Sequence, residues 1–463
     1  MSARSKLCLL AVALSGCSSL APPLERPALP VAATFAGQPA GKQATAPVVT
    51  PEWQNFFGDA RLRELITLAL QNNRDLKLAL LNIEQARAQL DLRRADPWPT
   101  LNAGLSGSRQ PTSAGGISSS YSAGVLVTAY ELDLFGRVRS LADATLAQYL
   151  ATEEARKAVQ ISLLAAVANG YYALLGDEEL LRITRQTLVT REDSYRLIKL
   201  RFDNGASSQI DLRQAESLLE SARVTLAQAT RQRALDENAL VLLLGQALPA
   251  GLPAALPLDV TASLPTLPVG LPSDVLLRRP DVRQAEQQLI AANASIGAAR
   301  AAFFPRISLT GSVGSVSSEL SGLFSNGMAW SFAPQLLQPI FDAGRNQANL
   351  RASEVGRDIA LAQYERAIQS AFREVADALA GRATLGEQLR AQQAQLKAEQ
   401  DRYRLAELRY RGGAASYLDA LDAQRSLFTA QQALLQVQTQ SLQNGVTLYR
   451  VLGGGWTAES TRP

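Results

Sequence analysis

The sequence predicts a mainly α-helical protein with a smaller β-sheet portion that crosses a membrane as part of a β-barrel, built from two copies of one structural unit. Three observations predict it. The chain contains an internal repeat, two long proline-free stretches carry apolar residues at helical spacing, and four short segments alternate between apolar and polar residues.

The repeat is visible in short motifs that recur at a nearly constant offset. Asp75 and Asp281 are 206 residues apart, as are Pro99 and Pro305, whereas Gly205 and Gly413 are 208 residues apart. A drift of two residues over half the chain argues against coincidence. We therefore divide the chain into a first repeat (59–260), a second repeat (261–456) and a short tail (457–463).

Each repeat contains a predicted β-hairpin, at about 99–132 and about 306–341. In the first, Leu101, Ala103 and Leu105 fall on one face of a strand and Asn102 and Ser106 on the other. Segments of about 9–11 residues with this alternation cross a bilayer when tilted, with one face toward lipid and one toward a lumen. A soluble antiparallel sheet with one wet face has the same pattern. The separation of the two hairpins in the sequence favours the membrane interpretation.

Each repeat also contains a long helical hairpin, at about 138–245 and about 345–452, preceded by a shorter helix at about 60–95 and 281–302. The first arms, 138–202 and 345–410, contain no proline and are far longer than ordinary globular helices. They indicate coiled-coil packing or a tubular wall. No later apolar run reaches the roughly 18–20 residues of a transmembrane helix, so we expect any membrane crossing to be made by strands.

Composition excludes several classes of function. The chain has no histidine, which removes the usual general base and the commonest metal ligand, so we predict no enzymatic activity. The net charge is only +4, and basic and acidic residues are interleaved, so we expect no nucleic-acid partner. No cofactor is predicted.

The N-terminus has the layout of a secretory signal (1–16), with Arg4 and Lys6 before an apolar run. The sequence from Leu14 to Cys17 resembles the bacterial lipobox, which implies that Cys17 carries acyl chains. The alternative is a plain secretory signal with an incidental cysteine. Residues 17–58 are rich in proline, alanine and small polar residues and read as an extended tether. The other cysteine, Cys8, lies within the signal, so no disulfide or zinc site is expected.

Four strands cannot close a barrel, and open sheet edges are not tolerated in hydrocarbon. Two copies would supply eight strands, whose interior is filled by side chains, whereas three would supply twelve and leave a lumen. We therefore expect a cyclic homotrimer in contact with outer-membrane lipid.

The whole mature chain resembles the outer-membrane efflux protein family, the TolC-type channels, and especially its lipoprotein branch. The resemblance rests on the order, duplication and spacing of motifs along the chain: Leu14 to Cys17, Trp53 to Asp59, Arg279-Pro280-Asp281, Phe304-Pro305, Arg409 to Gly413, Leu418 to Gln424 and Leu452 to Trp456. It implies a trimeric twelve-strand barrel with a twelve-helix α-barrel in the periplasm. It also implies a tripartite efflux system that exports drugs or other small toxic compounds, with a periplasmic adaptor and an inner-membrane transporter of the RND type as partners.

The turns of the two helical hairpins are the candidate functional site. Asp419 and Asp422 lie three residues apart on one helix face, and in a trimer each would form a ring of carboxylates. They match the acidic pair at the periplasmic entrance of TolC-type channels. For Asp419, simple capping of a helix start is an equal alternative. We expect these acids to hold the entrance shut together with Arg409, Tyr410 and Tyr417.

The turn residues themselves are candidates for adaptor docking, and they are Gly205, Ala206, Ser207, Gly412, Gly413 and Ala414. A plain tight turn is the alternative. For the whole chain, the rival functions are the outer-membrane duct of a type I protein secretion system, a periplasmic adaptor lipoprotein and a lipid-anchored structural coiled coil.

Overall fold

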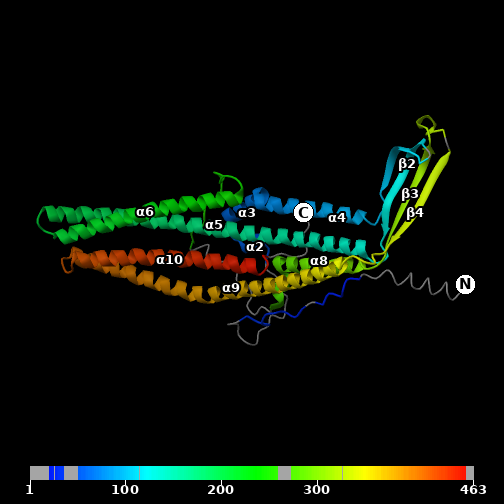
Figure 1. Ribbon diagram of the computed structural model, residues 1–463. Coiled ribbons are helices and arrows are strands. Elements are labelled where there is room, and N and C mark those ends of the chain that lie inside the picture. Colours follow the sequence, from blue (N-terminus) through cyan, green and yellow to red (C-terminus); the bar gives the residue numbers. More distant parts are fainter. Residues whose placement is uncertain are drawn as a thin grey trace. The chain divides into compact units, whose positions relative to one another are not determined.

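The computed structural model describes residues 20–25, 27–35, 51–113, 115–258, 273–325 and 327–454. Signal residues 1–16, Cys17 and the tail 457–463 therefore lie outside the described residues. The chain divides into two compact units (Figure 1). The strand unit comprises Met1–Leu29, Leu81–Ala155 and Arg283–Ala367, and the helical unit comprises Pro30–Leu80, Arg156–Val282 and Ile368–Pro463.

The strand unit contains one antiparallel sheet in the order β1-β2-β3-β4. Its strands are β1 (Leu101–Pro111), β2 (Ile117–Leu132), β3 (Arg306–Ser317) and β4 (Met328–Leu337). The four alternating segments of the sequence are all strands. The two hairpins, however, are not separate: β2 pairs with β3 along most of its length, so they form a single sheet (Figure 1).

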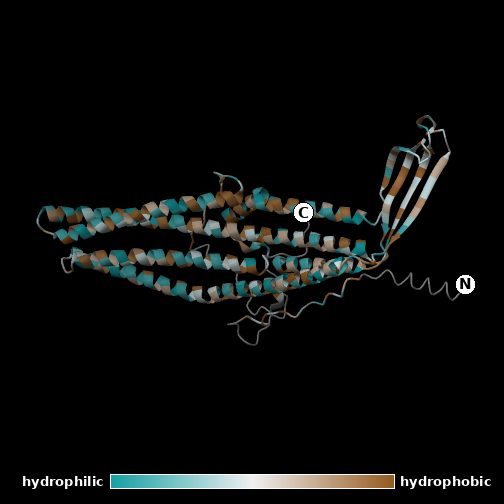
Figure 2. Cartoon of the chain, viewed as in Figure 1, coloured by the Kyte–Doolittle hydropathy of each residue, from teal (hydrophilic) through white to brown (hydrophobic). Residues whose placement is uncertain are grey.

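The register separates the two faces of this sheet by polarity. Leu105 pairs with Ala123, Val125 with Val313, and Val313 with Trp330, so these side chains share one face. Large apolar side chains on this face are open to solvent: Leu105 is 70% exposed and Trp330 72%. Figure 2 colours the strands by the hydropathy of their residues. An extensive exposed apolar face marks a surface that is covered by lipid or by another protein.

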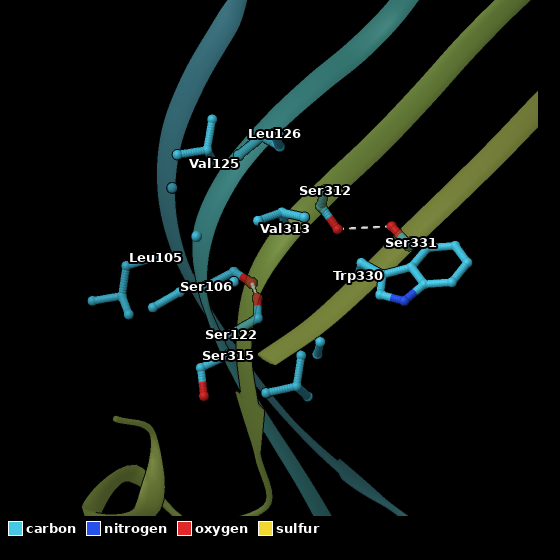
Figure 3. Close-up of a pocket in the computed structure, with 16 residues that line it drawn as sticks. Leu105, Ser106, Ser122, Val125, Leu126, Ser312, Val313, Ser315, Trp330 and Ser331 are labelled. Carbon is cyan, nitrogen blue, oxygen red and sulfur yellow. Dashed lines mark hydrogen bonds between the residues drawn. The ribbon is translucent and has the colours of Figure 1, made fainter. Parts of the chain in front are cut away.

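The opposite face is polar and carries small side chains. Ser106 and Ser122 are hydrogen-bonded to each other at 2.7 Å, as are Ser312 and Ser331 (Figure 3). These pairs cross from β1 to β2 and from β3 to β4. Serine pairs of this kind satisfy their own hydroxyl groups and leave little bulk, which suits a water-filled lumen.

Two glycines allow β2 and β3 to approach closely on the polar face. Gly124 pairs directly with Gly314, and a Cβ added to Gly314 would lie 2.6 Å from the Cα of Gly124. Real Cβ atoms do not come so close to backbone, so any side chain here must push the two central strands apart.

Gly314→Ala is therefore expected to destabilise the sheet, by about 1–3 kcal/mol, because overpacking against backbone cannot be relieved by a rotamer change. The measurement is the temperature at which the folded, heat-modifiable band is lost on a gel. Gly311→Ala is the matched control, since a Cβ there would meet its nearest atom, the Ser331 carbonyl oxygen, only at 3.4 Å. Equal temperatures for the two variants would contradict the packing argument.

The helices are α2 (Trp53–Phe56), α3 (Ala60–Asn72), α4 (Arg74–Ala95), α5 (Arg137–Asp203), α6 (Gln209–Leu244), α8 (Pro280–Ala301), α9 (Arg345–Arg411) and α10 (Tyr417–Val451), with short 3-10 helices η2 (Ser273–Arg278) and η3 (Leu320–Gly322). The predicted long arms are thus α5 and α9, each of 67 residues. Their companions α6 and α10 also agree closely with the sequence-based bounds.

The single helix predicted over 60–95 is wrong. It breaks into α3 and α4 at Asn73, whose backbone is extended. The Asn73 side chain explains the break: its Oδ1 accepts from the N–H of Leu76 at 2.9 Å, and its Nδ2 donates to the Leu243 carbonyl at the end of α6. Asparagine caps helices in this way, and a contact 170 residues away cannot be recognised from local periodicity.

One helix of the described residues, α5, has the length and composition to cross a membrane, contrary to the expectation from uninterrupted apolar runs. More than half of its apolar window, 56%, is buried within the protein. Tyr171 and Tyr172 are almost fully buried in the helical unit, and the Tyr171 hydroxyl donates to Asp59 at 2.7 Å. Packing inside the unit therefore accounts for the apolar character of this helix.

A buried ion-pair network joins three segments of the helical unit. Arg279 is 5% exposed and donates to Asp281 at 2.6 Å and to Glu374 of α9 at 2.9 Å. It also donates to the Val451 carbonyl at the end of α10. Although burial acts in the opposite direction, the hydrogen bonds that Arg279 donates to Asp281 and Glu374 raise its pKa above its ordinary value. The guanidinium group therefore stays charged and ties these segments together.

The predicted extended tether, 17–58, packs against other segments of the protein where it is described. In the strand unit, Asn293 donates to the Pro22 carbonyl and Arg300 to that of Leu20. In the helical unit, Phe35 stacks on Phe372, and Phe56 of α2 stacks on Tyr449 at 4.2 Å. The end of this segment is thus part of the core. The sequence before Trp53 has no periodic apolar pattern from which this packing could be predicted.

Candidate functional site at the helical turns

The turns that close the two helical hairpins share one design, as the repeat predicts. In each, a left-handed glycine ends the first helix: Gly205 has φ 74° and Gly413 has φ 71°. The following N–H bonds back to the helix, from Ala206 to the Arg201 carbonyl and from Ala414 to the Arg409 carbonyl. Only glycine adopts this conformation without strain, so the chain reverses at these two points.

Asp419 is engaged in capping α10. Ser416 and Asp419 form a reciprocal capping box, in which the Asp419 carboxylate accepts from the Ser416 N–H at 3.2 Å and from its hydroxyl at 3.0 Å. Ser208 and Asp211 do the same at the start of α6. The presence of the same box in both repeats explains Asp419 by helix capping, the alternative that the sequence left open.

Asp422 has a different environment. One carboxylate oxygen accepts a hydrogen bond from Arg402 of α9 and the other accepts one from Arg425 at 2.6 Å. The hydrogen bond from Arg402 is the main reason that the pKa of Asp422 lies below its ordinary value of 3.8. Asp422 therefore links α9 to α10 as a carboxylate.

The partners predicted for these acids are not the observed ones. Arg409 lies at the turn, where it donates to the Ala414 carbonyl at 3.4 Å rather than to Asp419 or Asp422. Arg402 and Arg425 were missed. The sequence could have indicated Arg402. Residues at equal distances from the turn of an antiparallel hairpin face each other, and Arg402 and Asp422 are each ten residues from Gly412.

The two tyrosines do lie together, and they connect the two hairpins. The rings of Tyr410 and Tyr417 are 5.1 Å apart. Arg201 of α5 donates to the Tyr410 hydroxyl at 2.6 Å and lies 5.1 Å from the centre of its ring. Arg201 was also missed, although it is the counterpart of Arg409 in the first repeat.

The turn residues proposed for docking are at the surface. Gly205, Ala206, Gly412, Gly413 and Ala414 are exposed, and Ser207 is half-buried and donates to Asp211 at 3.2 Å. One turn further, Ile210 and Leu418 occupy equivalent positions of the two repeats. Both are exposed, at 78% and 49%, although they are large and apolar. They extend the candidate docking surface beyond the turns, and the sequence had not singled them out.

A pair of facing carboxyl groups lies farther along the first hairpin, between α5 and α6. Burial and the adjacent Asp236 carboxyl raise the pKa of Asp177 from 3.8 to about 7. Glu178 also raises this pKa, whereas Arg233 lowers it. The folded protein therefore holds a proton that the unfolded chain releases between about pH 4 and 7. Its free energy of unfolding should fall as the pH rises through this range.

Asp177→Asn is expected to abolish this fall and to raise the thermal midpoint at pH 8 above that of the wild type, because the amide has no charge to desolvate. Circular dichroism melts from pH 4 to pH 8 provide the measurement. Asp203→Asn, at the exposed end of α5, should keep the wild-type pH dependence. If Asp177→Asn melts with the same pH profile as the wild type, the shared proton is absent.

Within the part of the chain that the structure describes, no group of three or more Cys, Asp or Glu side chains is arranged to hold a metal ion. Most charged groups near the turns are instead engaged in ion pairs or helix caps. What the site offers is a set of ion pairs and ring contacts that hold helices together at one end of the hairpins.

Comparison with known proteins gives the family. The family model described as outer membrane efflux protein matches residues 65–246 and, a second time, residues 271–454. The two matches begin 206 residues apart and end 208 residues apart, which are the offsets seen in the sequence motifs. The duplication is therefore a property of the family unit.

Full-length relatives agree with this match. The chain is 48% identical over 458 residues to the solvent efflux pump outer membrane protein SrpC of Pseudomonas putida, with 96% of each chain covered. It is 48% identical over 461 residues to the outer membrane protein OprJ of Pseudomonas aeruginosa, covering 97% of this chain and 95% of that one.

A solved structure gives the same fold. The open state of the MtrE outer membrane channel of Neisseria gonorrhoeae superposes with a TM-score of 0.87 at 42% sequence identity, covering 95% of this chain and 98% of that one. From the duplicated family match, the full-length relatives and this shared fold, the chain belongs to the outer membrane efflux protein family.

Proposed function

We propose that the chain is one subunit of a homotrimeric duct that carries small toxic compounds across the outer membrane. The observation that supports this most directly is the sheet, in which β1 and β4 are edge strands and one face is apolar and exposed. Unpaired backbone groups at a sheet edge each cost several kcal/mol in hydrocarbon, so the edges need partners.

Further copies of the same chain can supply the strands that pair with these edges, and no other protein is then required. Pairing β1 of one copy with β4 of the next gives a ring, and three copies give twelve strands with the serine-lined face inward. The same threefold symmetry places three α5–α6 and three α9–α10 hairpins around one axis, which is a twelve-helix tunnel in the periplasm.

The cargo and partners follow from the relatives. SrpC is named as the outer membrane protein of a solvent efflux pump, and another relative, ArpC of Pseudomonas putida, as that of an antibiotic efflux pump. We propose solvents and antibiotics as cargo, and a periplasmic adaptor with an inner-membrane transporter of the RND type as partners. The type I secretion duct remains the alternative, but none of these names favours it.

The test is deletion of the gene, followed by growth on a panel of antibiotics, dyes, detergents and solvents. Deletion should lower the inhibitory concentrations of several compounds, and the intact gene should restore them only when a cognate pump is present. Unchanged inhibitory concentrations, together with loss of a secreted protein, would favour the secretion duct instead.

Lipid anchoring at Cys17 is part of the proposal. Each buried acyl methylene contributes about 0.8 kcal/mol, so acyl chains add a second hold on the outer membrane to that of the barrel. The N-terminal peptide of the mature protein should carry the added mass of acyl chains on Cys17, and Cys17→Ala should lack it. An unmodified Cys17 in the mature wild-type chain would contradict the anchor.

At the other end of the hairpins we propose a gate and a docking surface. Asp422 with Arg402 and Arg425, and Arg201 with Tyr410 and Tyr417, are contacts that hold the helices together, and Arg409 and Asp419 stabilise the turns beside them. The docking surface for the adaptor comprises the two turns with Ile210 and Leu418. Exposed apolar side chains at equivalent positions of both repeats suit a partner that contacts each hairpin in the same way.

A further inference from the structure

A pocket of about 250 Å³ lies in the helical unit between α5 on one side and α9 and α10 on the other. Asp193 lines it from α5, and Tyr403, Glu407, Tyr410, Tyr417 and Gln424 line it from the other two helices. Three tyrosines and two carboxylates thus surround one small space. Helix capping and the ion pairs of Asp422 leave it unexplained.

Gln424 indicates that this pocket is built to receive a hydrogen-bond donor. Its side chain is almost fully buried, at 7% exposure, and hydrogen-bonds Tyr403. Its carbonyl oxygen Oε1 is also buried and has no partner among the described residues. Leaving a buried acceptor unpaired costs about 1–3 kcal/mol, so an occupant with an N–H or O–H group would recover that cost.

The charge of the lining indicates the sign of the occupant. Among the residues that line the pocket, Asp193 and Glu407 are acidic and Arg411 is the only base. Arg411 pairs with Glu407, so the remaining negative charge of the lining is that of Asp193, whose neighbour on α5, the exposed Arg196, lies 3.4 Å away. Burial raises the pKa of Tyr403 above its ordinary value and that of Tyr417 to about 12, so these hydroxyls stay neutral at physiological pH. The negative face of a tyrosine ring attracts a cation. Tyr410 already does so, because Arg201 lies over it.

We propose that this pocket binds a small planar organic cation of the amidinium or guanidinium class, with an N–H group donated to Gln424 Oε1 and the positive charge near Asp193 and the tyrosine rings. The volume limits the size, because drug-sized ligands occupy pockets of about 300–1,000 Å³. A single aromatic ring that carries one cationic group is the expected scale.

The test uses the purified full-length protein in detergent and benzamidine as the probe, with the heat of binding measured by titration calorimetry. Benzamide is the matched control ligand, because it has nearly the same shape but no charge. Benzamidine should bind saturably, and benzamide at least about tenfold more weakly, since hydrogen bonds to charged groups are the stronger ones.

Two variants locate the binding. Gln424→Leu removes the acceptor at similar volume and should weaken benzamidine about tenfold, and Asp193→Asn, at an exposed position that should not affect folding, should weaken it several-fold. Gln436→Leu, exposed on the same helix α10 and outside the pocket, should bind like the wild type. Equal affinities for benzamide and benzamidine, or wild-type affinity in both Gln424→Leu and Asp193→Asn, would overturn the assignment. Binding is measured without transport, so this result is independent of the proposed duct and gate.

Discussion

Asp422→Ala is expected to raise the single-channel conductance of the purified protein in lipid bilayers and to shift it toward long open states. The substitution removes both ion pairs of Asp422, with Arg402 and with Arg425. These side chains are partly exposed, so the loss is about 1 kcal/mol in each subunit. If three subunits open together, the total of about 3 kcal/mol changes the ratio of open to closed channels about a hundredfold.

Asp401→Ala provides the matched control. Asp401 also pairs with an arginine, Arg404 at 3.8 Å, but both lie on α9 and both are exposed. Its removal breaks no contact between helices, so conductance should stay at the wild-type level. If Asp422→Ala conducts like Asp401→Ala, then Asp422 is an ordinary surface carboxylate and the gate lies elsewhere.

The same ion pairs should give the wild type a defined pH dependence. Because the pKa of Asp422 is lowered in the folded protein, its stabilising contribution is complete above the ordinary value of 3.8 and is lost only as the pH falls through the lowered pKa. Asp422 should thus contribute no change in conductance between pH 5 and 8. An increase that begins near pH 6 would have to come from another group, such as Asp177.

Arg279→Ala is expected to be the most destabilising of these substitutions. It removes the shorter of two arginine contacts of Glu374, whose side chain is 28% exposed and which keeps Arg450 at 3.7 Å, and it removes the hydrogen bond to the Val451 carbonyl. Breaking a buried ion pair by removing one member costs about 3–5 kcal/mol, and the partial exposure of Glu374 and Asp281 places the expectation near the lower limit. The thermal midpoint of the helical signal should fall by several degrees.

Arg283→Ala tests whether this cost is specific. Arg283 lies four residues farther along the chain, on α8; its side chain is 52% exposed and its contact with Glu154 is long, at 3.8 Å, so its removal should cost well under about 1 kcal/mol. A double substitution of Arg279 and Glu374 by apolar residues should recover part of the loss, because no buried charge is then left alone. Equal midpoints for Arg279→Ala and Arg283→Ala would show that the network contributes little.

Local pattern was sufficient for most of the fold. Three local signals each predicted an element within a few residues. They are the strand alternation from Leu101 to Leu105, the proline-free stretches that form α5 and α9, and the turn glycines Gly205 and Gly413. Asn73 marks the limit. Its apolar surroundings continue the helical period, but the bond to Leu243 breaks the helix there.

The candidate site divides in the same way. The sequence by itself determined the duplication, the two turns, the capping boxes and the position of Asp422 on the exposed start of a helix, because these depend on residues within a few positions of each other. Only the tertiary structure decided that β2 pairs with β3, that Arg201 binds Tyr410, and that Gln424 lines a pocket. These contacts join residues from different hairpins, and side-chain periodicity carries no information about which hairpin lies beside which.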